Sequence, residues 1–200
     1  MLRRLAKRVL NPWLHYDSSG PLWLTFDDGP HENTLALLDA LDEVQVRALF
    51  FVQGVEAERR PEVLAETVRR GHRLGWHGQR HVHPRELSGA ALEADLARGR
   101  ALLEAQGQRG PFWYRPPYGG LVPRLFPRLR RNRFRLMMWN CDSEDSERSV
   151  DEVVASLAPA RLPPRPILLF HDDYAQTADT IRRLVPVWRD AGVEFALPDG

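Results

Sequence analysis

The feature of this chain that most constrains its fold is a regular alternation between short apolar runs and longer amphipathic segments. Seven apolar or aromatic runs have the length and composition of strands, at residues 21–26, 46–52, 72–77, 111–115, 134–139, 166–171 and 193–197. Between most of them, apolar residues recur with helical spacing, at residues 34–44, 61–70, 87–106, 149–158 and 177–191, with a weaker, proline-interrupted helix at 121–132. This alternation predicts right-handed crossovers and a parallel α/β sheet, either doubly wound or curled into a barrel.

The length of the chain favours the barrel. Its 200 residues suit one domain, whereas a regular barrel of eight strand–helix units typically needs ~250 residues. Seven units therefore predict a smaller, distorted barrel. We expect one catalytic domain over residues 20–200, preceded by a basic N-terminal segment at residues 1–19.

Charge and cysteine content exclude several classes of function. Lys and Arg total 28 against 27 Asp and Glu, so the net charge of +1 carries no signature of nucleic-acid binding. The single cysteine, Cys141, excludes an internal disulfide framework and a cysteine-rich zinc module. The sequence does not indicate the oligomeric state.

The N-terminal segment leaves two alternatives open. No stretch reaches the ~18 apolar residues of a membrane span, and the N-terminus lacks the ~7–15-residue apolar core of a signal peptide, which predicts a cytoplasmic protein. Residues 1–10 place Leu2, Leu5 and Val9 on one helical face and basic residues largely on the others. Residues 1–13 therefore offer a peripheral membrane contact, or alternatively a helix packed on the domain or a frayed end.

Acidic residues and histidines follow the predicted strands. They are Asp27 and Asp28, His77 and His81, Arg115 and Tyr118, Asp142 and Asp145, and His171. Because the carboxyl ends of parallel strands meet at one edge of an α/β fold, we expect these side chains to share one rim. That rim is the predicted active site.

The first two groups predict a metal site. Asp27 and Asp28 have an alternative role as turn or helix-cap residues, but adjacent carboxylates at a buried strand end repel unless a cation lies nearby. The i, i+4 spacing of His77 and His81 lets both rings face the same way on one helical turn and bind one ion. One Asp with two His is typical of catalytic zinc, although cobalt, manganese and nickel also accept this ligand set.

The later groups predict acid–base and oxyanion chemistry. In the alternative interpretation, Arg115 belongs to a rigid turn and His171 to the core. At a shared rim, Arg115 can hold a carboxylate ionised and the Tyr118 backbone N–H can face a developing oxyanion. An imidazole beside Asp142 or Asp145 has its protonated form favoured, so His171 is a candidate general acid.

Five segments, in order, resemble the polysaccharide deacetylase family, also known as NodB-homology proteins or carbohydrate esterase family four. They are Thr25-Phe26-Asp27-Asp28-Gly29-Pro30, His77-x-x-x-His81, Arg115-x-Pro117-Tyr118-Gly119, Asp142-x-x-Asp145 and Leu169-x-His171. The resemblance covers about residues 20–198. It implies a distorted seven-stranded (β/α) barrel and metal-dependent removal of an N- or O-acyl group from a sugar.

The resemblance also implies a role for each matching residue. Asp28, His77 and His81 would hold one divalent metal, zinc first, and Asp27 would be the general base. Arg115 would orient Asp27, and the backbone N–H of Tyr118 would form the oxyanion hole. His171 would be the general acid, and Asp145 would tune the pKa of His171.

Three departures from the family pattern affect the expected substrate. Gly78 replaces the usual Ser or Thr, two residues intervene between His81 and Pro84, and Ser146 replaces an aromatic residue that walls the acyl pocket. Trp76, Trp139 and Tyr118 are the candidate sugar-binding residues, although aromatic residues at strand ends more often belong to the core.

The expected activity is removal of an N-acetyl group from a saccharide or a saccharide precursor by metal-activated water. The alternatives are hydrolysis of another amide, such as a formamido sugar or a cyclic amide, and a non-catalytic relative that binds saccharide or lipid headgroups.

Overall fold

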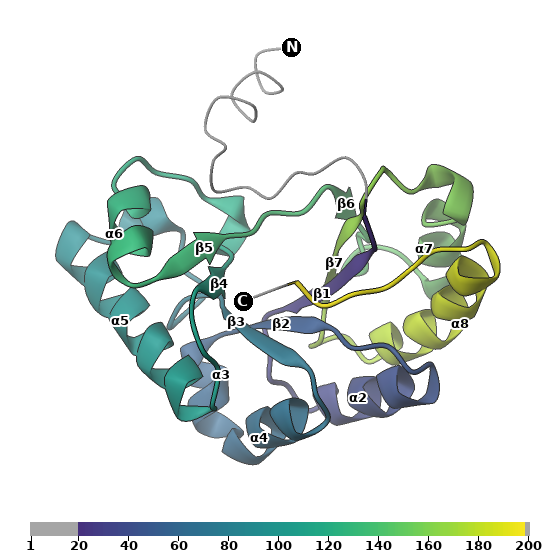
Figure 1. The fold of residues 1–200 in the computed structure, drawn as a ribbon, viewed down its shortest axis with the longest axis horizontal. Coiled ribbons are helices and arrows are strands. Elements are labelled where there is room, and N and C mark those ends of the chain that lie inside the picture. The colour runs from purple at the N-terminus through teal and green to yellow at the C-terminus, as the bar shows by residue number, and fades with distance from the viewer. Residues whose placement is uncertain (1–19, 199–200) are drawn as a thin grey trace, which may run out of the picture.

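The computed structural model describes residues 20–198, so the predicted basic segment at residues 1–19 lies outside the described residues. Seven parallel strands form one sheet in the order β5-β4-β3-β2-β1-β7-β6, curled into a half-barrel (Figure 1). The strands are β1 (Trp23–Asp27), β2 (Leu49–Val52), β3 (Arg73–Trp76), β4 (Phe112–Tyr114), β5 (Phe134–Leu136), β6 (Cys141–Asp142) and β7 (Ile167–His171). The predicted distorted seven-stranded barrel is confirmed, and within residues 20–198 its sheet stays open between β5 and β6.

Helices cover the outer face of the curled sheet (Figure 1). They are α2 (Thr34–Glu43), α3 (Gly54–Arg59), α4 (Pro61–Arg69), α5 (Gly89–Ala105), α6 (Leu125–Arg131), α7 (Val150–Ser156) and α8 (Gln176–Asp190). All six helices predicted from spacing are present. The short α3 was not predicted, because six residues give too few apolar positions to show a helical period.

One predicted strand is wrong. Residues 193–197 form only an isolated bridge, between Phe195 and Leu22, and run across the edge at which β1 begins. The Leu22 N–H donates to the Glu194 carbonyl at 2.7 Å. The seventh strand is instead Cys141–Asp142, whose two residues carry no apolar run for a sequence pattern to detect.

Strand alternation divides the buried residues into two cores. Along β1, Leu24 and Phe26 belong to the large core between sheet and helices, whereas Trp23 belongs to a smaller cluster inside the curl. This interior cluster comprises Trp23, Leu49, Phe51, Trp113, Met137 and Ile167. The same period of two turns Asp27 inward at the carboxyl end of β1.

A close contact between α5 and β3 fixes the strand that precedes His77. Trp76 is fully buried, and a methyl group added at the helical Gly99 would lie 2.4 Å from its indole ring. No helix among residues 20–198 is long and apolar enough to cross a membrane.

We predict that Gly99→Ala destabilises the protein, although the same change in an exposed helix stabilises by about 1 kcal/mol. The added methyl group must displace Trp76, and overpacking typically costs about 1–3 kcal/mol. Urea unfolding measures the change in the free energy of unfolding. Arg98→Ala, one residue away and exposed, is the control and should change stability by less than about 0.5 kcal/mol. A more stable Gly99→Ala protein would contradict this packing.

Candidate active site

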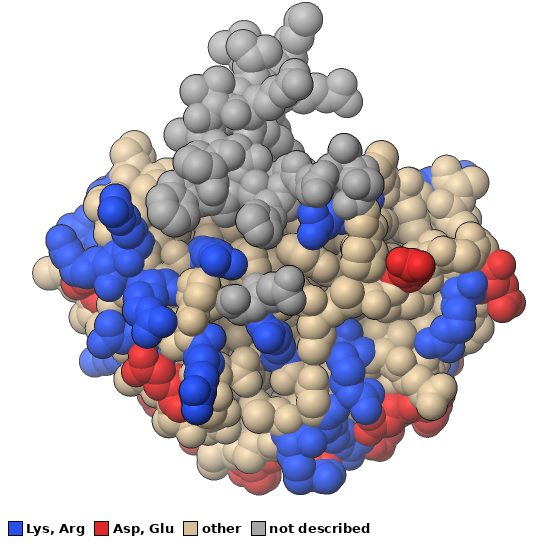
Figure 2. Space-filling model, in the orientation of Figure 1, with Lys and Arg blue, Asp and Glu red and all other residues tan. Residues whose placement is uncertain are grey.

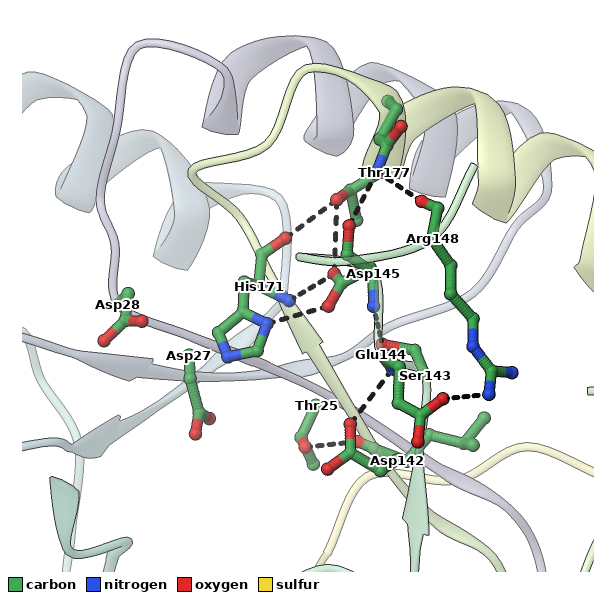
Figure 3. Close-up of polar contacts among 12 residues, drawn as sticks. Thr25, Asp27, Asp28, Asp142, Ser143, Glu144, Asp145, Arg148, His171 and Thr177 are labelled. Atoms are coloured by element: carbon green, nitrogen blue, oxygen red, sulfur yellow. Dashed lines mark hydrogen bonds and ion pairs between the residues drawn. The ribbon is translucent and has the colours of Figure 1, made fainter. Parts of the chain in front are cut away.

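The predicted site residues meet at the carboxyl ends of the strands. Asp27 ends β1, Asp28 follows it, His77 follows β3 and His171 ends β7. Figure 3 shows both aspartates beside His171, with Asp145 on the far side of the imidazole. The structure therefore brings together acids and bases that the sequence separates by more than 140 residues.

Asp28, His77 and His81 form a three-residue cluster with metal-ligand character. One ligand atom from each lies within 4.8 Å of the others. The Asp28 Oδ1 lies 3.5 Å from the His77 Nε2 and 3.6 Å from the His81 Nε2. The backbone turns Asp28 away from the strand with a φ of 83°, and the Gln53 side-chain amide donates to Asp28 Oδ1 at 2.8 Å.

The two histidines converge without the helical turn expected from their spacing. His77 lies directly after β3 and His81 lies in the following bend, so the helix prediction is wrong although the rings lie 5.1 Å apart. The His77 Nδ1 lies 2.8 Å from the Arg115 carbonyl oxygen. A carbonyl can only accept, so Nδ1 carries the proton and Nε2 faces the cluster with a free lone pair. Burial lowers the pKa of His77 well below its usual value, which keeps the ring neutral.

Gly78 explains the first departure from the family pattern. Its φ of 90° lies in the left-handed region that side chains rarely adopt, and an added Cβ would meet the Arg80 carbonyl oxygen at 3.0 Å. The bend between His77 and His81 therefore depends on a glycine at this position.

A buried ion pair joins Asp27 to Arg115. The Arg115 Nη1 donates to Asp27 Oδ1 at 2.7 Å, and both side chains are almost fully buried. The second carboxylate oxygen of Asp27 faces His77, with Oδ2 3.8 Å from Nε2. Burial raises the pKa of Asp27 and the charge of Arg115 opposes that rise. Asp27 is therefore a buried carboxylate, oriented by Arg115 and placed beside the cluster.

The guanidinium of Arg115 is itself fixed by the interior of the barrel. It lies 4.2 Å from the centre of the Phe51 ring, and Nη1 also donates to the Thr25 hydroxyl at 2.8 Å. The Arg115 Nε donates to the Met137 carbonyl at 3.3 Å. Gly75 leaves the space that Phe51 occupies, because an added Cβ would lie 2.6 Å from that ring.

His171 is held by Asp145 on the other side of the cleft. The His171 Nδ1 lies 2.8 Å from Asp145 Oδ1, and its backbone N–H donates to Asp145 Oδ2 at 2.8 Å (Figure 3). Burial alone lowers the pKa of His171, but the hydrogen bond and charge of Asp145 outweigh it and raise the pKa to about 9. His171 is therefore protonated at neutral pH. Asp142, the alternative partner left open by the sequence, contacts Trp139 instead.

Tyr118 lines the cleft. It adopts a left-handed φ of 58°, its side chain is exposed, and its ring lies 4.2 Å from the ring of His81. It belongs to the short 3-10 turn Pro117–Gly119, which follows β4.

A cavity of about 680 Å³ contains the site, within the range of small-molecule sites. Trp139 and Ser146 line it, together with Asp142, Glu144 and Glu147. The predicted sugar-binding role of Trp76 is wrong. Its side chain points into the helix-facing core and its indole N–H donates to Asp95 at 3.0 Å.

Sequence reasoning missed two residues that support the cluster. Gln53 directly follows β2 at the same rim. Its place after a predicted strand could have identified it from the sequence. Asp95 lies on α5, accepts from the Trp76 indole and the Gln79 backbone, and so ties the bend that carries His77 to the helix. In the sequence, Asp95 is marked only as a single acidic residue on the apolar side of a predicted helix.

Comparisons with known proteins agree with this geometry. The sequence model described as polysaccharide deacetylase matches residues 16–137, more than half of the chain. A chitooligosaccharide deacetylase of Bradyrhizobium sp. is 30% identical, with 87% of each chain covered. A peptidoglycan-N-acetylglucosamine deacetylase of Bacillus cereus is 26% identical, covering 86% of this chain and 83% of the relative.

A solved structure shares the fold over most of the chain. The family 4 carbohydrate esterase from Streptomyces lividans, in complex with acetate, superposes with a TM-score of 0.83 at 29% identity, covering 90% of this chain and 93% of that one. Fold, motif order and sequence match thus agree over most of the described residues. The chain belongs to the polysaccharide deacetylase family.

Proposed function

We propose that this protein is a metal-dependent hydrolase that removes an N-acetyl group from a saccharide. The observation that carries the proposal is the placement of a three-ligand cluster between a buried carboxylate and a protonated imidazole in one cleft. The deacetylase names of the relatives support the same reaction.

The donor set fits a divalent ion. Ligand atoms about 2.0–2.2 Å from tetrahedral zinc lie roughly 3.4 Å from one another. The Asp28 Oδ1 lies 3.5 and 3.6 Å from the Nε2 atoms of His77 and His81. Asp28, His77 and His81 would hold the metal, with zinc the first candidate and cobalt, manganese or nickel as alternatives. When bound, such a metal polarises the acyl carbonyl and lowers the pKa of a coordinated water.

The residues around the cluster divide the proton transfers between them. Asp27, oriented by Arg115, takes the proton from the attacking water. The Tyr118 N–H donates to the oxyanion that develops on the acyl carbon. Because the Nδ1 proton of His171 is held by Asp145, the Nε2 proton is the one delivered to the departing nitrogen.

The acidic mouth of the cleft points to the charge of the substrate. Asp142, Glu144 and Glu147 line it, so a neutral or partly deacetylated glucosamine chain is favoured over one that carries carboxylates. We include a cytoplasmic location in the proposal, which favours a soluble, lipid-linked or nucleotide-linked precursor as the natural substrate.

Removing the metal should abolish acetate release from acetylated chito-oligosaccharides, and adding zinc or cobalt should restore it. Gln53→Ala removes the donor that orients Asp28, and loss of such an outer partner typically weakens metal binding 10–100-fold. Competition with a chelating dye measures the affinity. Gln108→Ala, in the loop before β4, is the matched control. Equal affinity of both variants would contradict the role of Gln53.

The pH profile should report His171. Since the reaction needs the protonated imidazole, kcat/KM should fall as the pH rises through about 9. In Asp145→Asn the hydrogen bond and the charge that raise the pKa of His171 most are lost while burial remains, so this limb should move to lower pH. Asp142→Asn, at the end of β6 and exposed, is the control and should keep the limb near pH 9. An unchanged limb in Asp145→Asn would contradict the assignment of the acid.

The charge of the mouth should set a preference between substrates. We expect N-acetylglucosamine oligomers to be better substrates than muramic acid analogues, and Glu144→Gln/Glu147→Gln to reduce this preference about fivefold, or about 1 kcal/mol. The ratio of kcat/KM values measures it. Glu62→Gln/Glu104→Gln, on outer helices, should leave the ratio unchanged. A loss of preference in both pairs would exclude a local effect.

A broader substrate panel tests the alternatives. Ser146 leaves the acyl side of the cleft without an aromatic wall, which is compatible with a formamido sugar or a cyclic amide. If the protein hydrolyses a formamido sugar or a cyclic amide and not N-acetyl sugars, that amide is the substrate class. Stoichiometric metal with no turnover on any amide would favour a binding role.

A further inference from the structure

Most charged side chains among residues 20–198 are at least partly exposed, and Figure 2 shows many of them on one face of the molecule. Five carboxyl or guanidinium groups in this range are nevertheless buried: Asp27, Asp95, Arg115, Asp145 and Asp172. The first four form the ion pair beside the cluster, the link from α5 to the bend after β3, and the partner of His171. The carboxyl group of Asp172, which is 1% exposed, takes part in none of these contacts. Because burying a carboxyl group costs free energy, its contacts indicate what it does.

Asp172 lies beside the loop that carries a predicted metal ligand. It directly follows β7, and its backbone N–H donates to the Asp27 carbonyl at 3.2 Å, which continues the pairing of β7 with β1. Residues 28–33, here called the β1–α2 loop, follow β1 on the other side of this hydrogen bond. Asp28 opens the loop with its φ of 83°. Asp172 is therefore next to the loop from which Asp28 extends.

The carboxyl group of Asp172 occupies the space in which Gly29 would carry a side chain. A Cβ added to Gly29 would lie 1.9 Å from Asp172 Oδ2 and 2.4 Å from its Cγ. The φ of Gly29 is not positive, so close packing, rather than a left-handed backbone, is what requires a glycine here. The contact with Asp172 thus accounts for the glycine that follows Asp28.

Two hydrogen bonds in series tie Asp172 to the same loop. The hydroxyl group of Thr34, the first residue of α2, donates to Asp172 Oδ2 at 2.7 Å. The His31 N–H donates to the Thr34 hydroxyl oxygen at 2.7 Å, and a hydroxyl group that accepts there still has its proton for the carboxyl group. Thr34 and Asp172 are each almost fully buried, so bulk water does not compete for these hydrogen bonds.

The β2 side of the loop is held independently. The Gln53 backbone N–H donates to the Gly29 carbonyl at 2.9 Å, and the Gln53 side-chain amide donates to Asp28 Oδ1 at 2.8 Å. Gly29 is thus fixed by Gln53 on one side and by Asp172 on the other. Removing either support should free Asp28 to leave the position in which its Oδ1 faces both histidines of the cluster.

We propose that Asp172 is a positioning residue for metal binding, which sets the place of Asp28 by packing against Gly29 and by accepting the hydrogen bond of Thr34. Asp172 acts through the loop and contacts neither the metal nor the substrate. The inference rests on the metal dependence contained in the proposed function. It extends the metal site to a residue that lies outside the ligand set.

The zinc affinity of the full chain, measured by competition with a chelating dye, tests the proposal. Asp172→Ala removes the carboxyl group, and loss of such an outer support typically weakens metal binding 10–100-fold. Asp172→Asn keeps an oxygen that can accept from Thr34, so it should lose less affinity than Asp172→Ala. Thr34→Val should also weaken binding, whereas Thr34→Ser keeps the hydroxyl group and should bind zinc like the unaltered protein.

Thr67→Val is the matched control. Thr67 is likewise buried in a helix, on α4, and its hydroxyl group donates one hydrogen bond, to the Val63 carbonyl at 2.9 Å. This variant should lose stability in urea unfolding but keep the zinc affinity of the unaltered protein. Equal zinc affinities of Thr34→Val and Thr67→Val would overturn the proposal. Failure of the unaltered protein to bind zinc or another divalent metal would instead overturn the metal dependence on which it rests, so the two failures are distinguishable.

A double-mutant cycle tests the packing contact separately. Gly29→Ala alone should cost zinc affinity, because its methyl group collides with the carboxyl group of Asp172. In Gly29→Ala/Asp172→Ala the three atoms nearest to the added Cβ are removed, so Gly29→Ala should cost less affinity in the Asp172→Ala protein than in the unaltered one. An equal cost in both proteins would contradict the contact. If Gly29→Ala does not fold, the Thr34 variants and their control still decide the proposal.

Discussion

The buried ion pair between Arg115 and Asp27 is the interaction on which the rest of the site depends. Moving a carboxylate or guanidinium into a protein interior costs several kcal/mol per ion unless a partner is held at good geometry. Thr25, Phe51 and the Met137 carbonyl fix the guanidinium, and the guanidinium fixes the carboxylate. The interior of the barrel therefore holds one oriented acid beside the cluster of Asp28, His77 and His81.

The two histidines on either side of this pair show how surroundings set chemistry. His77 is buried and donates to a backbone carbonyl, so it stays neutral with a lone pair toward the cluster. His171 receives the charge of Asp145 and stays protonated. One imidazole is thereby suited to bind a cation and the other to supply a proton, although both lie at the carboxyl ends of strands in one sheet.

Sequence reasoning predicted the parts of the structure that repeat and missed those that occur once. Alternation along the strands predicted the sheet, and the acids and histidines after the strands predicted the rim. The two-residue strand at Cys141 and the bridge at Phe195 depend on tertiary pairing, which leaves no periodic signal. Alternation places Trp76 on the face opposite to that of its neighbour His77, toward α5, where its indole meets Asp95 and Gly99, so a residue beside a site histidine is not itself at the site.

The open seam of the sheet has a consequence for the behaviour of the protein in solution. A sheet that does not close leaves backbone donors and acceptors along its outermost strands, where other chains can add. Here those strands are β5 and β6, with three and two residues. Edge strands this short offer almost no template on which a strand of another chain can pair. The sheet is therefore protected from edge-to-edge aggregation although the barrel is not closed.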